Sequence, residues 1–183
     1  EQDQVDAIIG PAQANCVLAV GKYLTASNKP EFTLINVPFL ANKNPGKNVF
    51  SLCGTRQGWT RQLGIYAYDV AGYKTATIIS QDMVAGEDLA KGFTDEFEAK
   101  GGKVIQRQRV PMGTMDYTPY VTAIQKADVV CFWLLPQETQ RFLPLYLNSG
   151  LGMPVILLHG SFPEAMLQQI GDKTVGITSV NRW

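Results

Sequence analysis

The chain has 183 residues, of which 45% are hydrophobic, and its 16 basic residues balance 16 acidic ones. This length allows one ordinary domain or two small lobes with a hydrophobic core. The balanced charge argues against nucleic acid or an anionic lipid surface as a partner. No apolar run reaches the roughly 18 residues that a membrane-spanning helix needs, and the polar N-terminus is not a signal peptide.

The first part of the chain predicts short strands separated by helices, because its apolar residues recur at strand or helix spacing. The expected strands cover residues 5–9, 32–35 and 49–53, and the expected helices cover 17–24 and 57–70. The segment 42–48 is rich in Asn, Pro and Gly and predicts a surface turn. Ala71, Gly72 and Tyr73 end the second helix and mark the passage to the next lobe.

A strand, a helix and a second strand follow between Lys74 and Pro111. Thr and Ile residues at 75–80 predict a strand that is buried on both faces. Apolar residues recur every three or four positions between 87 and 100, which is the stripe of an amphipathic helix. A strand is expected at 103–110. Because βαβ crossovers are right-handed and join parallel strands, this unit predicts a parallel sheet.

Alternating elements continue to the end of the chain. The expected helices cover 118–126, 138–148 and 162–170, and the expected strands cover 128–135, 154–158 and 174–180. Five strands from Lys74 onward suffice for a doubly wound α/β lobe. We therefore predict an α/β fold with Rossmann-like parallel sheets, in which residues 1–72 form a partial N-terminal lobe and residues 73–183 a nearly complete C-terminal lobe.

The central unit also carries a family resemblance. The strand is followed by Gln81-Asp82-Met83-Val84-Ala85-Gly86 and then by a helix that opens Glu87-Asp88-Leu89-Ala90. This series resembles the type I periplasmic binding proteins, and within them the substrate-binding proteins of branched-chain amino acid ABC transporters and their relatives for amides and aromatic acids. The similarity extends over most of the chain, including residues 5–11 and 128–150.

The resemblance implies a function. The chain is expected to be an internal portion of a bilobed, extracytoplasmic solute-binding component of an ABC transporter, located in the periplasm or outside the cell. Its expected partners are a small-molecule ligand, bound between two lobes that close on it, and a membrane permease. The alternative is a ligand-sensing domain of a receptor or regulator with the same fold. An incomplete first lobe would also expose an open sheet edge, so self-association of this portion is expected.

Ligands of open α/β sheets bind beyond the carboxyl ends of the strands, and five such loops agree with the contact loops of the family. The candidate ligand-binding residues in them are Gln13, Ala14, Asn15, Val37, Pro38, Phe39, Asp82, Val84, Ala85, Pro136 and His159. Free main-chain N–H groups at residues 12–15 would suit a carboxylate, although a structural turn explains that loop equally well. Trp59 could reach the ligand cleft, or it could belong to the core.

His159 is the most informative departure from the family pattern. The resemblance places it where amino-acid-binding members have an acid that pairs with the ligand's ammonium group. Histidine does not carry that permanent negative charge, but it can donate to an anion. We therefore expect a small organic acid, including aromatic carboxylates, in preference to a free amino acid. Asp82 could replace the missing acid or could shape its turn, and His159 could merely cap the following helix.

No enzymatic pattern is evident. The chain has one histidine, and it lacks a nucleophile elbow, a phosphate loop and a set of metal ligands. We therefore expect no catalysis, no cofactor and no metal. The cysteines are Cys16, Cys53 and Cys131. The sequence leaves open whether Cys16 and Cys53 form a disulfide, and Cys131 lies in an apolar run that is typical of a buried strand.

Overall fold

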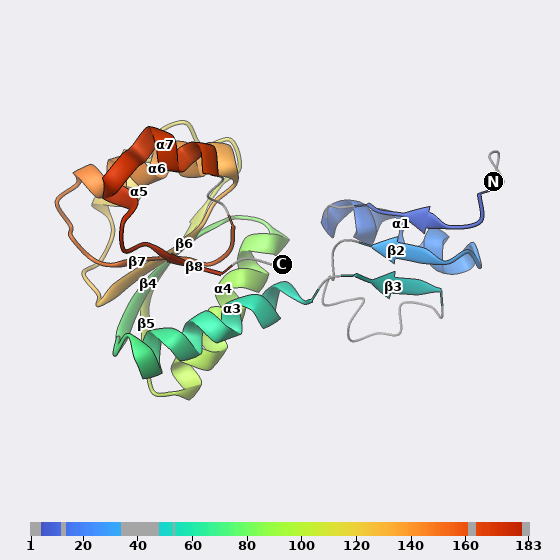
Figure 1. The fold of residues 1–183 in the computed structure, drawn as a ribbon, viewed down its shortest axis with the longest axis horizontal. Helices are drawn as coiled ribbons and strands as arrows, with labels where there is room; N and C mark the ends of the chain where they lie inside the picture. The colour runs from blue at the N-terminus through green and yellow to red at the C-terminus, as the bar shows by residue number, and fades with distance from the viewer. Residues whose placement is uncertain (1–4, 12–13, 34–47, 53, 161–163, 181–183) are drawn as a thin grey trace. The chain divides into compact units, whose positions relative to one another are not determined.

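The structure is a computed structural model that describes residues 5–11, 14–33, 48–52, 54–160 and 164–180 (Figure 1). The chain forms two compact units, residues 1–56 and 57–183. Each unit has its own parallel sheet.

The first unit contains a three-stranded sheet in the order β1-β2-β3. Its strands are β1 (Ile8–Ile9), β2 (Glu31–Thr33) and β3 (Val49–Ser51), and helix α1 (Ala14–Ala26) connects the first two. Phe32 pairs with Ile9 on one side and with Phe50 on the other. Glu31 is only 1% exposed, and this burial raises the pKa of its carboxyl group above the ordinary value.

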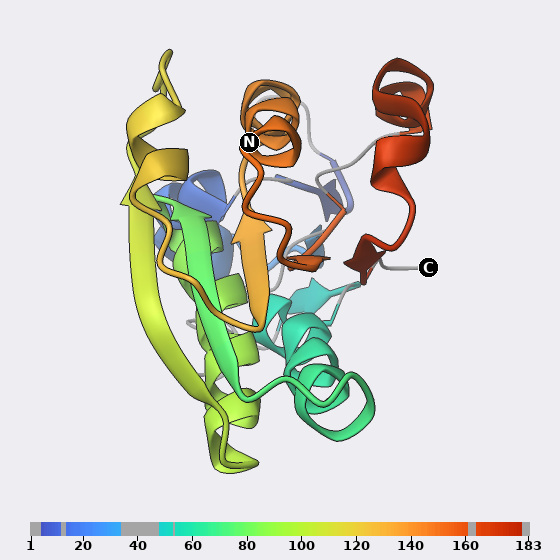
Figure 2. The ribbon, with the colours of Figure 1, turned by 90° about the vertical axis from the view of Figure 1, so that its left-hand side faces the viewer.

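The second unit contains a five-stranded parallel sheet in the order β5-β4-β6-β7-β8. Its strands are β4 (Thr75–Gln81), β5 (Lys103–Val110), β6 (Val129–Trp133), β7 (Val155–Leu157) and β8 (Thr178–Ser179). β4 lies between β5 and β6, and Figure 2 shows these strands side by side. Asp128 supports the amino end of β4, because its carboxylate accepts hydrogen bonds from the main-chain N–H groups of Lys74 and Thr75 and from the Thr75 hydroxyl.

Helices cover both faces of this sheet (Figures 1 and 2). One face carries α5 (Thr118–Thr122), α6 (Pro136–Asn148) and α7 (Glu164–Ile170), and the other carries α3 (Arg56–Ile65) and α4 (Val84–Ala99). Successive side chains of a strand point to opposite faces. Ile79 therefore packs among the residues of α5 and α6, while Ile78 packs against α3 and α4. A π-helical turn, η1 (Tyr66–Val70), follows α3, and a 3-10 turn, η2 (Gly171–Thr174), follows α7.

Helices α3 and α4 approach each other closely because glycines lie at their contacts. A Cβ added to Gly64 would lie 2.5 Å from the Phe93 carbonyl oxygen. A Cβ added to Gly92 would lie 2.4 Å from the Gln57 carbonyl oxygen and from the Thr60 hydroxyl. No side chain larger than hydrogen fits at these positions unless the main chain moves. The glycines thus set how α3 sits on α4.

The predicted α/β fold with parallel, doubly wound sheets is confirmed. The strand expected at 103–110 is observed as β5 with the same bounds. The helix expected at 118–126 ends already at Thr122, because Gln106 of β5 donates to the Ala123 carbonyl and accepts from the Gln125 N–H. These bonds occupy main-chain groups that a longer helix would need.

Two further differences concern the ends of the second unit. The strand expected at 174–180 is only Thr178–Ser179, because Gly176 has a φ of 89°, which no extended strand adopts. The compact units divide at residues 56 and 57, and α3 packs on α4 of the second unit. The division into functional lobes at residues 72 and 73 stays a prediction.

Candidate functional site at the carboxyl edge of the second sheet

Three of the predicted ligand loops lie at one edge of the five-stranded sheet. β4, β6 and β7 are parallel neighbours, with Ser80 paired to Trp133 and Phe132 paired to Leu157. Their carboxyl ends therefore share an edge. The loops that leave this edge carry Asp82, Val84, Ala85, Pro136 and His159. The structure brings these five predicted residues to the same edge of the sheet.

Gln81 connects the loops that leave this edge. Its side chain is fully buried, and its amide nitrogen donates to the carbonyl oxygens of Val110 and Pro111 at 2.9 and 3.1 Å. Its amide oxygen accepts from the Leu135 N–H at 3.4 Å. One side chain at the end of β4 thus touches the main chain that follows β5 and the main chain that enters α6. Sequence reasoning missed this role, because only the neighbours in space reveal it.

A second buried polar group supports the loop after β5. Glu138, in the first turn of α6, is 7% exposed, and its carboxylate accepts a hydrogen bond of 3.1 Å from the Gly113 N–H. Tyr117 lies beside it and is 1% exposed. Burial, and then the negative charge of Glu138, raise the pKa of the Tyr117 hydroxyl. The hydroxyl therefore stays protonated and can coexist with the neighbouring carboxylate.

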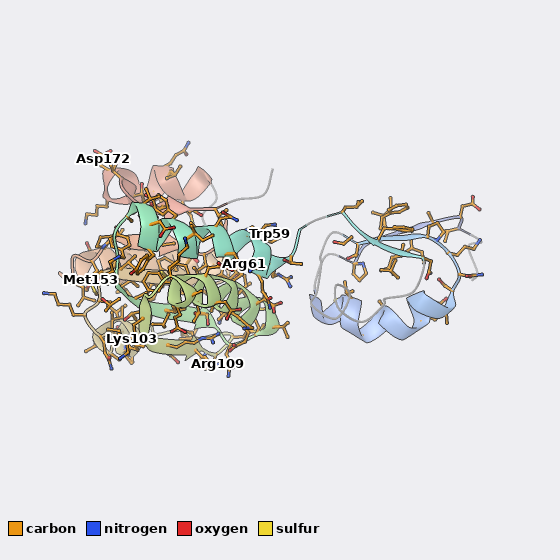
Figure 3. All side chains as sticks on the ribbon, turned by 90° about the horizontal axis from the view of Figure 1, so that it is seen from below. Trp59, Arg61, Lys103, Arg109, Met153 and Asp172 are labelled. Carbon is orange, nitrogen blue, oxygen red and sulfur yellow. The ribbon has the colours of Figure 1, made fainter. Side chains whose placement is uncertain are left out.

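Asp82 is held in an ion-pair network on β5 and α4. Its carboxylate lies 2.7 Å from an Arg109 guanidinium nitrogen, and the same guanidinium contacts Glu87 at 2.9 Å. Arg107 contacts Glu87 as well, at 2.6 Å. Figure 3 labels Arg109 on β5. A carboxylate that is already neutralised by a guanidinium is a poor partner for a ligand's ammonium group.

The other predicted residues of this edge differ in accessibility. Val84 is 47% exposed, whereas Ala85 is only 5% exposed. Both lie in the first turn of α4, which begins three residues earlier than expected. A Cβ on Gly86 would lie 2.1 Å from the Gln81 carbonyl oxygen, so this turn is pressed against the end of β4. Pro136 is the exposed first residue of α6.

His159 contacts an aromatic side chain from α3. The imidazole and the Trp59 indole have ring centroids 4.6 Å apart and planes at 72°, an edge-to-face arrangement. Both side chains are partly exposed. Trp59 also packs against the hydrophobic cluster that joins α3 and α4 to the sheet. Trp59 is therefore a core residue on one side, as one interpretation held, and a neighbour of His159 on the other.

The predicted residues of the first unit are less fully described. Ala14 and Asn15 are the first residues of α1, where main-chain N–H groups have no partner within the helix. Gln13, Val37, Pro38 and Phe39 lie outside the described residues. Cys53 lies outside them too, so the question of a Cys16–Cys53 disulfide stays open. Cys131 is fully buried, as expected, and burial raises the pKa of its thiol.

Comparison with known proteins decides the family. A sequence model described as "Periplasmic binding protein" matches residues 1–183, the whole chain. The chain belongs to the periplasmic binding protein family. Among curated proteins of this family, Leu/Ile/Val-binding protein homolog 6 of Brucella suis is 26% identical over 112 residues, which are 58% of this chain and 29% of the relative.

Solved structures of periplasmic binding proteins share the fold. The ABC transporter substrate-binding protein from Sphaerobacter thermophilus is 26% identical with a TM-score of 0.88, over 97% of this chain and 50% of that one. A solute-binding protein of an R. palustris ABC transporter, solved with 4-hydroxybenzoate, is 26% identical with a TM-score of 0.83, over 96% and 49%. The chain therefore spans about half the length of the solved structures it matches.

The predicted resemblance to type I periplasmic binding proteins of ABC transporters is confirmed by these comparisons. Proteins of this family bind solutes. Among the described residues, no helix combines the length and the apolar content that crossing a membrane would require. In that same part of the chain, His, Cys, Asp and Glu side chains do not gather into a metal-binding group.

Two hollows of the second unit differ in their relation to the carboxyl edge. A cavity of about 210 Å³ is lined by Gly160, which follows His159 in the chain, and by α7 and β8 residues such as Leu167 and Ser179. A larger hollow of about 460 Å³ is lined by Met153 and Pro154, which precede β7, and therefore lies at the amino edge. Ligands of open α/β sheets bind at the carboxyl edge. The smaller cavity is the one that accompanies the candidate site.

Proposed function

We propose that this chain is part of the solute-binding component of an ABC transporter and that its ligand is a small organic acid. An aromatic carboxylate is the favoured class, and an amino-acid-like ligand is the alternative. The similarity to a solute-binding protein solved with 4-hydroxybenzoate supports the first class, and the similarity to a Leu/Ile/Val-binding protein homolog supports the second. His159 would be among the contacts of this ligand.

The observation that carries the proposal is the charge at the carboxyl edge. An α-amino acid needs a negative partner for its ammonium group, since burying that charge alone costs several kcal/mol. Asp82 is the one carboxylate among the predicted ligand residues, and Arg109 holds it. His159 stands where the resemblance expects an acid. An imidazole at this place favours an anion or a neutral oxygen over an ammonium group.

The remaining parts of the proposal follow from the family. The component would work in the periplasm or outside the cell and would deliver its ligand to a membrane permease. It would bind and release the ligand unchanged, without catalysis. A binding protein of this kind needs affinity and closure rather than a nucleophile. A tightly bound ligand that is recovered unaltered after prolonged incubation is the expected result.

Isothermal titration calorimetry on the full-length protein tests the ligand class. We expect benzoate and 4-hydroxybenzoate to bind, and leucine and valine to bind weakly or not at all. Tight binding of leucine or valine, with no response to either acid, would overturn the proposed class. It would leave the family assignment in place, since the family does not depend on the ligand.

Replacing His159 with Gln tests the role of the imidazole. Imidazole groups change charge between about pH 5 and pH 8. If the imidazolium binds the carboxylate, wild-type affinity for the acid falls as pH rises through that range. His159→Gln should weaken binding at low pH and flatten this dependence. Lys91→Gln serves as the control and should keep the wild-type profile, because Lys91 is exposed on α4 and pairs with Asp95 of the same helix.

A further inference from the structure

The contact between Trp59 and His159 joins segments that are far apart in the sequence. Trp59 belongs to α3, which precedes the sheet in the chain, and His159 follows β7. Their ring centroids are 4.6 Å apart. The five loops expected to contact the ligand do not include α3. The structure thus adds a helix to the surroundings of the candidate site.

The helix that carries Trp59 is held in place by its neighbours on α4. The glycines at 64 and 92 fix the approach of α3 to α4. Gln57 donates to the Asp88 carboxylate at 3.2 Å, and Arg61 donates to Glu96 at 2.7 Å. These bonds lie two residues before and two residues after the indole, and Figure 3 marks Trp59 and Arg61 on α3. The main chain that carries the indole is therefore fixed, and the ring packs on one side against the cluster of α3 and α4.

His159 is held independently, from the side of the sheet. Leu158 is fully buried, and its N–H donates to the Phe132 carbonyl at 3.0 Å. This bond continues the β6–β7 pairing by one residue beyond β7. The main chain that carries the imidazole is therefore fixed, and the ring lies edge-to-face with the indole. Together, the indole and the imidazole form a partly exposed aromatic pair at the carboxyl edge.

We propose that Trp59 is a specificity-determining residue, which holds the His159 ring in position and favours a planar aromatic carboxylate over a saturated acid of similar size. This inference rests on the proposed function, since it presumes an acid ligand beside His159. The imidazole supplies the donor for the carboxylate. The edge-to-face pair supplies an aromatic surface, and aromatic rings attract one another beyond the effect of buried area alone.

The test compares benzoate with cyclohexanecarboxylate, which keeps the carboxylate and the six-membered ring but is not aromatic. Calorimetry on the full-length protein should show that the wild type prefers benzoate. In Trp59→Leu the ratio of the two affinities should fall by about two- to tenfold, the value of one aromatic pair. Trp59→Phe should restore most of the preference. Tyr68→Leu is the matched control, since Tyr68 is a partly buried aromatic residue on the same cluster, and it should keep the ratio.

Positioning can be measured without any ligand. His159 is the only histidine of the 183-residue chain, so its imidazole proton signals in NMR spectra of this chain are unique. The indole ring current should displace these signals in the wild type and in Tyr68→Leu, and the displacement should vanish in Trp59→Leu. Unchanged signals in Trp59→Leu would overturn the positioning role.

The outcomes separate the two proposals. Wild-type protein that binds neither acid refutes the proposed ligand class, and this inference with it. A benzoate preference that survives unchanged in Trp59→Leu refutes the inference alone and leaves the proposed function standing. An equal loss for both acids also refutes it, because a merely structural role of Trp59 would weaken both.

Discussion

Replacing Gly92 with Ala tests whether the α3–α4 contact is as close as the structure has it. The new methyl group would lie 2.4 Å from the Gln57 carbonyl oxygen and from the Thr60 hydroxyl, and 2.7 Å from the Gln57 Cα. Carbon and its neighbours normally approach to about 3.5 Å. Helix α3 must therefore retreat by roughly 1 Å, since two of the three atoms belong to its main chain.

The expected magnitude is the balance of two effects. Forcing extra volume into a packed contact costs about 1–3 kcal/mol. Alanine in a helix is favoured over glycine by about 1 kcal/mol. The net effect of Gly92→Ala is therefore a loss of about 0–2 kcal/mol in the free energy of unfolding of the second unit.

Urea denaturation followed by tryptophan fluorescence is the suitable assay. All three tryptophans lie between residues 57 and 183, so their fluorescence reports on the second unit. Gly21→Ala is the control, because it is the same change in α1, where no described atom lies within 4 Å of the added methyl group. The control should leave the fluorescence midpoint unchanged. A Gly92→Ala protein that is more stable than the wild type would refute the reasoning.

Three further predictions follow from other contacts. Gln81→Leu should lower the free energy of unfolding by about 2 kcal/mol, because buried hydrogen bonds are lost. Gln108→Leu removes one partly exposed hydrogen bond and should lower the free energy of unfolding by less. The urea midpoints of the two variants measure this difference. Main-chain donors lower the pKa of the Asp128 carboxyl group. The stability that its carboxylate adds is therefore present above about pH 4 and is lost as pH falls through the folded-state pKa. Asp128→Asn should be less stable than the wild type at pH 7, and the difference in stability between the two proteins should shrink at pH 3. Phe50 and Leu52 are 48% and 60% exposed, so the chain should self-associate in light scattering, and a strict monomer at high concentration would contradict this.

The fold was predictable where the pattern is local. The alternation of buried strands and one amphipathic helix between residues 74 and 111 depends on periodicity alone, and β4, α4 and β5 appear there. Helix α5 shows the limit of such patterns. Gln106, on β5, forms hydrogen bonds with the main-chain carbonyl of Ala123 and the main-chain N–H of Gln125. The local spacing of residues does not reveal a bond between a strand and the end of a helix.

The loops of the candidate site could be predicted from the sequence, but the side-chain contacts that its residues make could not. Parallel strands end at a common edge, and this placed Asp82, Pro136 and His159 together. The pairing of Asp82 with Arg109 depends on how β5 lies beside β4. One signal was present, since residues two apart in a strand share a face and Arg107 and Arg109 are such a pair. The contact of Trp59 with His159 had no comparable signal.

The amide of Gln81 has a consequence for how new ligand preferences can arise. It holds the main chain of two neighbouring segments, and it does so without involving the less buried side chains at 83, 84, 136 and 137. Substitutions at those positions can therefore change the chemistry offered to a ligand while the scaffold beneath them keeps its shape. A library that randomises these side chains and spares Gln81 should yield many folded variants. The residue that supports the main chain at this edge is thus not one of those proposed to contact the ligand, so a change in the proposed contacts need not disturb the support.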